Sequence, residues 1–222
     1  MPRVVEPRAE ALPHEAASNG CFETMRAYGG RIFRLDAHLE RLYASAQFLG
    51  TRPPDRARLR GELVQALSRS RLQEAVVRVA LLPRRDQPAQ PSVVVQAASV
   101  LPASAYRSGI RASVVPARKF SVGSIDPRAK YSARLGSVLA VADSQLRGVD
   151  EALFMDALGG VTESTASNLG AVSRGVILTP PCWLGLLAGI TRDVLFAAPG
   201  VPPARQAGMR QSCVRRNAEC VM

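Results

Sequence analysis

Short apolar runs bounded by turn residues occur in three parts of the N-terminal half of the chain. Residues 21–28 are followed by Gly29-Gly30 and by a brief run over 31–33, which predicts a β-hairpin on a Gly-Gly turn. Residues 75–82 and 92–99 are rich in β-branched and apolar side chains, and the loop between them contains three prolines. We expect these two runs to be core strands.

Between these strands, apolar positions recur at helical spacing. A helix capped by Asp36 and ended by Gly50 is predicted, with a buried face of Leu39, Leu42, Tyr43, Ala46 and Leu49. A second helix is predicted after the segment 53–55, and its buried face consists of Leu59, Leu63 and Leu67. The N-terminal half is therefore predicted to be α+β.

Small and polar residues at 102–105 suggest a boundary, so we expect a small α+β domain over 1–103 and a larger domain over 104–222. The second domain is predicted to contain a strand at 109–115 and a helix closed by Gly148. Strands at 152–157, from 161 and at 176–179 follow, and a last helix begins near 189–193. The expected buried side of the first of these two helices is Leu135, Val138, Leu139, Ala142 and Leu146.

Residues 201–222 show neither a strand period nor a helix period. This tail contains two of the four cysteines and four arginines against one glutamate. We interpret it as an atypical tail without regular structure. Such a tail would leave a domain that lacks core partners and has an exposed sheet edge.

Composition excludes several classes of protein. With 222 residues, 47% hydrophobic and 21% charged, the chain is long and apolar enough for a globular core rather than for disorder or collagen. The longest apolar stretch, 183–190, is interrupted by two glycines, so no membrane helix or membrane partner is expected. The first residues lack the apolar region of a secretory signal, and we expect a cytoplasmic protein. No CxxC motif or histidine cluster suggests a metal site.

The positive charges are almost all arginine. Lysine and arginine together number 29, and Lys119 and Lys130 are the only lysines. A lysine that cannot be replaced by arginine could be one whose amine must lose its proton and form a Schiff base. Two lysines retained by chance would give the same count. The net charge of +11 does not predict a nucleic-acid partner, because the arginines are scattered and aromatic residues make up only 5%.

Six segments, in order and at their spacing, resemble the class IV aminotransferases, pyridoxal 5'-phosphate (PLP) enzymes that include branched-chain and D-amino-acid aminotransferases and aminodeoxychorismate lyase. These segments are 20–26 (GCFETMR), 33–42 (FRLDAHLERL) with Ser45-Ala46, the Lys130 segment to 140, 150–153 (DEAL), 161–163 (VTE) with Ser167-Asn168, and 179–181 (TPP) with 189–192 (GITR). The resemblance implies the two-domain fold-type-IV architecture, here with a C-terminal domain that ends early.

The resemblance also assigns roles. Lys130 would be the catalytic Schiff-base lysine, Glu163 the carboxylate beside the pyridine nitrogen, and Arg41 with Ile190-Thr191 the phosphate anchor. Without the resemblance, each of these residues has an ordinary reading. Lys130 and Arg41 could be surface cations, Glu163 a solvated glutamate at the end of a strand, and Thr191 a helix cap.

The resemblance leaves the reaction open. Segment 22–26 and the intact 189–191 are closer to the aminotransferases, which predicts amino transfer between an amino acid, branched-chain ones included, and a 2-oxo acid. Arg134 is more similar to the lyase members, so release of pyruvate in 4-aminobenzoate synthesis is the alternative. A catalytically incompetent fragment is a second alternative, because relatives usually continue further. The family also implies a homodimer.

Overall fold

The computed structural model describes residues 20–99, 103–118, 129–133, 135–198, 204–210 and 219–221. The chain divides into two compact units, one formed by Met1–Ser108 with Ala129–Arg134 and the other by Gly109–Arg128 with Leu135–Met222. The short segment that carries Lys130 thus packs with the N-terminal unit, although it follows that unit's strands and helices in sequence. In the described part of the chain, no helix combines the length and apolar character needed to cross a membrane.

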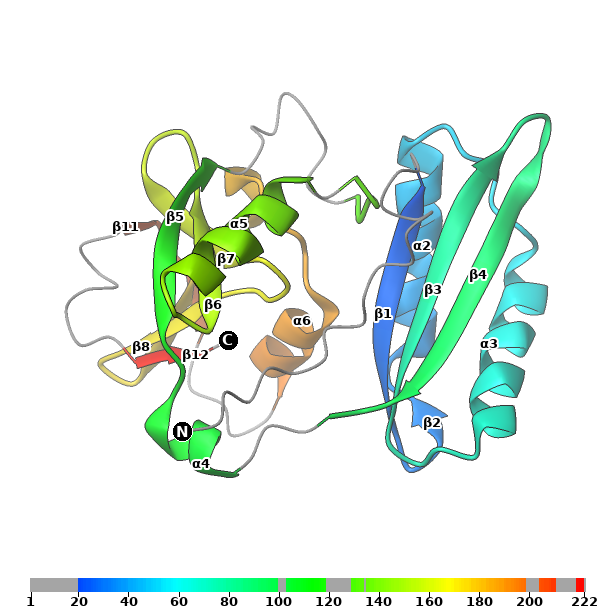
Figure 1. Ribbon diagram of the computed structural model, residues 1–222, viewed down its shortest axis with the longest axis horizontal. Helices are drawn as coiled ribbons and strands as arrows, with labels where there is room; N and C mark the ends of the chain where they lie inside the picture. Colours follow the sequence, from blue (N-terminus) through cyan, green and yellow to red (C-terminus); the bar gives the residue numbers. More distant parts are fainter. Residues whose placement is uncertain are drawn as a thin grey trace. The chain divides into compact units, whose positions relative to one another are not determined.

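The N-terminal unit contains a four-stranded sheet in the order β2-β1-β3-β4 (Figure 1). The predicted hairpin is confirmed: β1 (Cys21–Tyr28) and β2 (Arg31–Ile32) are antiparallel with Tyr28 opposite Arg31. Gly29 and Gly30 form the two-residue turn with φ of 53° and 72°. Positive φ at both turn positions is the conformation that favours glycine and matches the twist of the strands.

The second hairpin is longer than predicted. β3 (Ala75–Arg84) and β4 (Gln87–Ala97) extend through the segment that the three prolines suggested to be a loop. Pro88 and Pro91 are tolerated because β4 is the edge strand, and Pro83 lies at an irregularity between Leu82 and Arg84. The turn is made at Asp86, which has a φ of 58°.

Two helices cover one face of this sheet. The helix predicted after 53–55 is confirmed as α3 (Arg56–Ser70), and the structure shows that Asp55 caps it, because its side chain accepts a hydrogen bond from the Arg58 N–H, 2.8 Å away. The predicted cap of the first helix is wrong. Helix α2 (Leu35–Phe48) already contains Asp36 in its first turn, and Arg34 occupies the cap with a φ of 51° and no side-chain cap bond.

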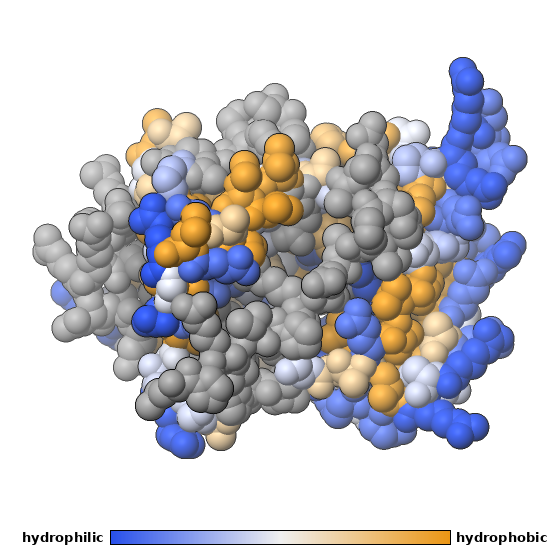
Figure 2. Space-filling model, in the orientation of Figure 1, coloured by the Kyte–Doolittle hydropathy of each residue, from blue (hydrophilic) through white to orange (hydrophobic). Residues whose placement is uncertain are grey.

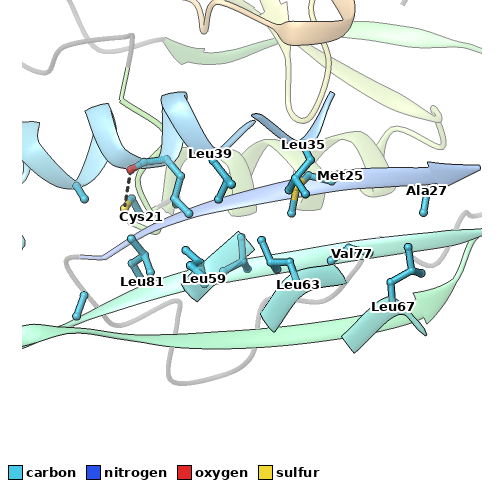
Figure 3. Close-up of a cluster of buried hydrophobic side chains, with 14 of the residues drawn as sticks. Cys21, Met25, Ala27, Leu35, Leu39, Leu59, Leu63, Leu67, Val77 and Leu81 are labelled. Atoms are coloured by element: carbon cyan, nitrogen blue, oxygen red, sulfur yellow. Dashed lines mark hydrogen bonds between the residues drawn. The ribbon is translucent and has the colours of Figure 1, made fainter. Parts of the chain in front are cut away.

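The core of this unit lies between the two helices and strands β1 and β3 (Figure 3). The leucines of α3 point toward β3, and Leu35 and Leu39 of α2 lie over β1. Leu59, Leu63 and Leu67 are buried as their spacing predicted. The Cys21 thiol contacts the Leu42 carbonyl oxygen at 3.7 Å. The core therefore fixes α2 against the strand that carries residues 21–28.

The second unit contains two four-stranded sheets, in the orders β11-β7-β6-β5 and β10-β9-β8-β12. Strand β5 (Ala112–Arg118) is parallel to β6 (Glu151–Met155), and helix α5 (Leu135–Leu146) lies between them in sequence. Strand β7 (Gly160–Ser164) returns antiparallel to β6, and β8 (Gly170–Ser173) pairs with β9 (Val176–Thr179). A short α4 (Ala103–Ser108), a 3₁₀ turn (Cys182–Leu184) and α6 (Ile190–Ala197) complete the described helices.

The predicted buried face of α5 is wrong. Leu135, Val138, Leu139 and Leu146 are 57–89% exposed, and the buried residues of this helix are Ala140 and Ser144. The helix packs through its small residues, with Ala140 in a cluster with Val115, Ala152 and Phe154 of the sheet. Small side chains at i and i+4 let a helix approach a sheet closely, so the larger apolar side chains lie outside (Figure 2).

The interpretation of the tail as structureless is also wrong. β10 (Ala204–Gln206) is parallel to β9, β11 (Met209–Arg210) is antiparallel to β7, and β12 (Glu219–Val221) is antiparallel to β8. Met209 is 3% exposed and belongs to a core cluster with Leu153 and Val161. Strands of two or three residues show no measurable period, so only long-range pairing reveals them.

Candidate active site

The Lys130 segment forms an extra piece of strand beside β1. Phe22 N–H donates to the Lys130 carbonyl at 3.0 Å, and Ser132 N–H donates to the Gly20 carbonyl at 2.8 Å. Tyr131 lies opposite Cys21 in an antiparallel bridge. β2 pairs with the far end of β1, so the Lys130 segment lies along the beginning of that same edge.

Helix α2 holds the same segment through a buried serine. Ser45 is fully buried, its hydroxyl donates to the Arg41 carbonyl at 2.8 Å, and it accepts the Lys130 N–H at 2.9 Å. The Lys130 amine lies 4.9 Å from the centroid of the Phe22 ring, within cation–π range. The backbone of Lys130 is therefore fixed from two sides, by β1 and by the turn of α2 that carries Arg41.

Arg41 forms a two-pronged ion pair with a carboxylate on β1. Its Nε and Nη2 lie 2.6 Å and 2.8 Å from Oε1 and Oε2 of Glu23. His38, one turn earlier on α2, lies with Nδ1 2.8 Å from Glu23 Oε2. An ionised carboxylate can only accept, so His38 Nδ1 carries the hydrogen in this contact. The side chain of Glu23 is 0% exposed, and those of His38 and Arg41 are 10% and 14% exposed.

The pKa of Glu23 is lowered from its ordinary value of 4.5. Burial is the largest influence and acts in the opposite direction, because it penalises the charged form. The hydrogen bonds from Arg41 and His38 and the positive charges of Arg41 and Lys130 together outweigh burial. Glu23 is therefore an anion that is held in the protein interior by its partners.

Sequence reasoning did not assign Glu23, although a signal was present. Along β1, Cys21, Met25 and Ala27 share one face because side chains alternate, and all three belong to the core. Glu23 lies on that same apolar face. A carboxylate in such a position needs a cationic partner, and His38 and Arg41, three residues apart on the adjacent helix, supply it.

In the second unit, Glu163 lies on β7 and is 7% exposed. Its Oε2 accepts the Leu187 N–H at 3.0 Å and the Asn168 side-chain amide at 3.3 Å. The ordinary reading of Glu163 as a solvated glutamate at the end of a strand is therefore wrong, because the carboxylate is buried and hydrogen-bonded.

Asn168 connects Glu163 to the start of helix α6. Its amide nitrogen also donates to the Leu187 carbonyl at 2.8 Å. Its carbonyl oxygen lies where a Cβ on Gly189 would be, so any side chain at Gly189 would collide with Asn168. Gly189 is the residue that caps α6. The sequence resemblance included Asn168 and Gly189, but it did not indicate that they are in contact.

Ile190 and Thr191 are the first two residues of α6, and no side chain of the described residues caps that end of the helix. Thr191 is exposed and is not the cap residue itself, so its ordinary reading as a cap is wrong. The buried Arg192 ties this turn to the end of β9, since its Nε lies 3.2 Å from Thr179 Oγ1. The first N–H groups of a helix have no intrahelical acceptor, which makes this end suited to an anion.

The structure thus places Arg41 and Lys130 in the N-terminal unit, where both act on Glu23. Glu163, Ile190 and Thr191 lie in the second unit, connected through Leu187, Asn168 and Gly189. Arg134, which suggested the lyase, and Lys119, the second lysine, lie outside the described residues. The site residues predicted from the sequence thus supply an amine and a guanidinium in the N-terminal unit, and a buried carboxylate and a helix N-terminus in the second unit.

Comparison with known proteins identifies the family. The model of the amino-transferase class IV family matches residues 20–202, which is most of the chain and includes Glu23, Arg41, Lys130, Glu163 and the start of α6. The chain belongs to the class IV aminotransferases. The match begins at Gly20 and runs past α6, so both described groups of side chains lie in the family region.

Relatives of this class IV chain are named for branched-chain amino acids. A protein of Methanocaldococcus jannaschii with the provisional name of branched-chain-amino-acid aminotransferase is 34% identical over 188 residues, which are 80% of this chain and 64% of the relative. The chain therefore spans less than two thirds of that relative's length.

Solved structures confirm the fold-type-IV architecture. The branched-chain aminotransferase of Thermoproteus uzoniensis with norvaline is 28% identical, with a TM-score of 0.77 over 90% of this chain and 72% of that one. The T.th. branched-chain amino acid aminotransferase with pyridoxamine 5'-phosphate is 26% identical, with a TM-score of 0.82 over 92% and 73%. The fold is thus the one that the sequence resemblance implied.

Proposed function

We propose that this chain is a PLP-dependent aminotransferase that moves an amino group between an amino acid and a 2-oxo acid. The observation that carries the proposal is the placement of Lys130. Its backbone is fixed by β1 and by Ser45, its amine lies over the Phe22 ring, and its positive charge acts on the ion-paired Glu23. A reactive amine needs this kind of fixed position.

The side chains present fit PLP. When bound, this group supplies an aldehyde that condenses with an amine and a ring that accepts electrons from the substrate α-carbon. Lys130 would hold it covalently and move the proton at the α-carbon. Arg41 and the N–H groups of Ile190 and Thr191 would bind the phosphate, and Glu163 would keep a proton on the pyridine nitrogen.

Branched-chain amino acids are the substrates we propose first, because the Methanocaldococcus relative and the Thermoproteus structure are both named as branched-chain aminotransferases. The lyase reading rested on Arg134 and has no support from the described residues. A homodimer is the expected assembly, and light scattering checks it against the chain mass of 23.8 kDa.

The test of the Schiff-base role is simple because the chain has only two lysines, Lys119 and Lys130. The purified chain is incubated with PLP, gel-filtered and examined by absorption before and after borohydride, beside Lys130→Ala and the matched control Lys119→Ala. We expect a retained yellow band that borohydride fixes to Lys130, that Lys119→Ala keeps and that Lys130→Ala loses. A folded wild-type chain that retains no band would overturn the proposal in favour of an incompetent fragment.

Loaded enzyme is then assayed with branched-chain amino acids and 2-oxoglutarate, and separately for pyruvate release from aminodeoxychorismate. Amino transfer without pyruvate release supports the aminotransferase, and the reverse supports the lyase. Glu163→Gln should keep the band and lose turnover by roughly a hundredfold or more, because it removes the charge at nearly unchanged shape. Near-normal turnover of this variant contradicts the role of Glu163.

A further inference from the structure

Glu23 is a buried charge to which the proposed function gives no task. It lies on β1 with no exposed surface, on a face that is otherwise apolar. Both of its oxygens contact Arg41, at 2.6 Å and 2.8 Å. A buried carboxylate is costly unless its partners compensate it, so its presence on this face calls for a physical reason.

We propose that Glu23 is a positioning residue that fixes the plane of the Arg41 guanidinium, so that the arginine presents N–H donors to the phosphate of PLP. The inference rests on the proposed function, because it takes Arg41 as a phosphate ligand. It goes beyond that function by assigning the geometry of the phosphate site to a residue of a different element, strand β1.

The geometry of the ion pair restricts the orientation of the Arg41 guanidinium. Nε and one Nη of a guanidinium lie on the same edge, and two parallel bonds to one carboxylate fix both the plane and the rotation of the group. Arginine has five N–H donors, more than this carboxylate takes. A guanidinium that is already fixed loses little side-chain freedom when it binds an anion.

The carboxylate is itself held in place. His38 Nδ1 contacts Glu23 Oε2 at 2.8 Å from the same helix that carries Arg41. Glu23 therefore cannot rotate away without breaking contacts to two residues of α2. The positive charges of Arg41 and Lys130 both act on Glu23 and help to keep it ionised, so the carboxylate that holds the guanidinium stays charged.

A purely structural ion pair between β1 and α2 is the rival explanation, and one measurement separates the two. Pyridoxal differs from PLP only by the phosphate group. A residue that acts through the phosphate site changes the ratio of PLP affinity to pyridoxal affinity. A residue that only supports the fold changes both affinities together.

The experiment measures dissociation constants of PLP and pyridoxal by absorption titration for wild type, Glu23→Gln, Glu23→Asp and Arg41→Gln. The matched control is Glu40→Gln, which removes the same charge from an exposed position of α2 next to Arg41. We expect Glu23→Gln to weaken PLP roughly ten- to hundredfold with little change for pyridoxal. Glu40→Gln should leave both affinities unchanged. Because Glu23 acts through Arg41, the double variant Glu23→Gln/Arg41→Gln should have the same ratio of PLP affinity to pyridoxal affinity as Arg41→Gln alone.

Glu23→Asp keeps the buried charge and therefore preserves the fold if Glu23→Gln does not fold. Its shorter side chain moves the carboxylate away from the guanidinium, and we expect the same selective loss of PLP. An unchanged ratio of the two affinities in the folded Glu23 variant overturns the positioning role and leaves the proposed function intact. A wild-type chain that binds PLP no more tightly than pyridoxal overturns both.

Discussion

The charge of Glu23 links the stability of the N-terminal unit to pH. A carboxyl whose pKa is lowered on folding contributes stability that is fully present above its ordinary pKa of 4.5 and is lost as the pH falls through the lower folded value. We therefore expect the free energy of unfolding to decrease below pH 4.5, and to decrease less steeply in Glu23→Gln. Urea unfolding at several pH values measures this slope.

Glu40→Gln is the control, since it removes a carboxylate from an exposed position of the same helix. Equal acid slopes for wild type and Glu23→Gln contradict the buried ion pair as described.

Cys21 shows the opposite direction of shift. Burial, followed by the negative charge of Glu23, raises the pKa of its thiol from 9.0 to about 12. The thiolate is the nucleophile, so at pH 8 its fraction is about a thousandfold below that of a thiol with the ordinary pKa. We expect iodoacetamide to modify the partly exposed Cys182 in the folded chain and to leave Cys21 unmodified until denaturant is added. Peptide mass spectrometry reads each site, and early labelling of Cys21 contradicts the prediction.

Individual residues were predictable where chemistry restricts the choice of side chain. Lysine is scarce, which drew attention to Lys119 and Lys130, and the family resemblance selected Lys130, whose role stays a prediction. Glu23 was missed because its neighbours in sequence do not include His38 and Arg41, which face it only after α2 packs on β1. The contact between Asn168 and Gly189 was missed for the same reason.

Among the elements, the start of α6 depends on a single glycine. Gly189→Ala would place a methyl group on the Asn168 carbonyl oxygen, and Asn168 would have to leave Leu187 and Glu163. We expect a loss of about 1–3 kcal/mol in the free energy of unfolding, which is the range for a broken buried hydrogen bond. The strain is steric only, because the φ of Gly189 is −81°.

Gly61→Ala is the matched control. Gly61 is an exposed residue inside α3 with nothing near the position of an added Cβ, so alanine should stabilise the chain by about 0.5–1 kcal/mol. Opposite signs for the two substitutions in thermal or urea unfolding support the contact. A neutral Gly189→Ala rules it out.

Elements were predictable when local signals agreed. The Gly29-Gly30 turn and the start of a helix after 53–55 depend on residues within a few positions, and both are found. The buried side of α5 was wrong because helical spacing shows that a helix has an apolar side but not that its small residues face the sheet. At the start of α2, Arg34 and not Asp36 is the cap residue, because the helix already begins at Leu35.

At the scale of the whole molecule, the tail is part of the second unit. Met209 is buried with Leu153 and Val161, so Met209→Ala should lower the free energy of unfolding by about 2–5 kcal/mol. Gln206→Ala, an exposed position of the same tail, should change it by no more than about 0.5 kcal/mol. Equal effects of the two substitutions on the free energy of unfolding would contradict the packing of the tail against the core of the second unit.

The pairing of the Lys130 segment with β1 sets an order of events during synthesis. Lys130 N–H bonds to Ser45 across a separation of 85 residues, and Phe22 bonds to Lys130 across a longer one. Closing such a large loop is slow compared with forming the hairpin and the two helices. During synthesis on the ribosome, part of one edge of β1 therefore stays unpaired until the Lys130 segment emerges, and this segment is the last part of its unit to pair.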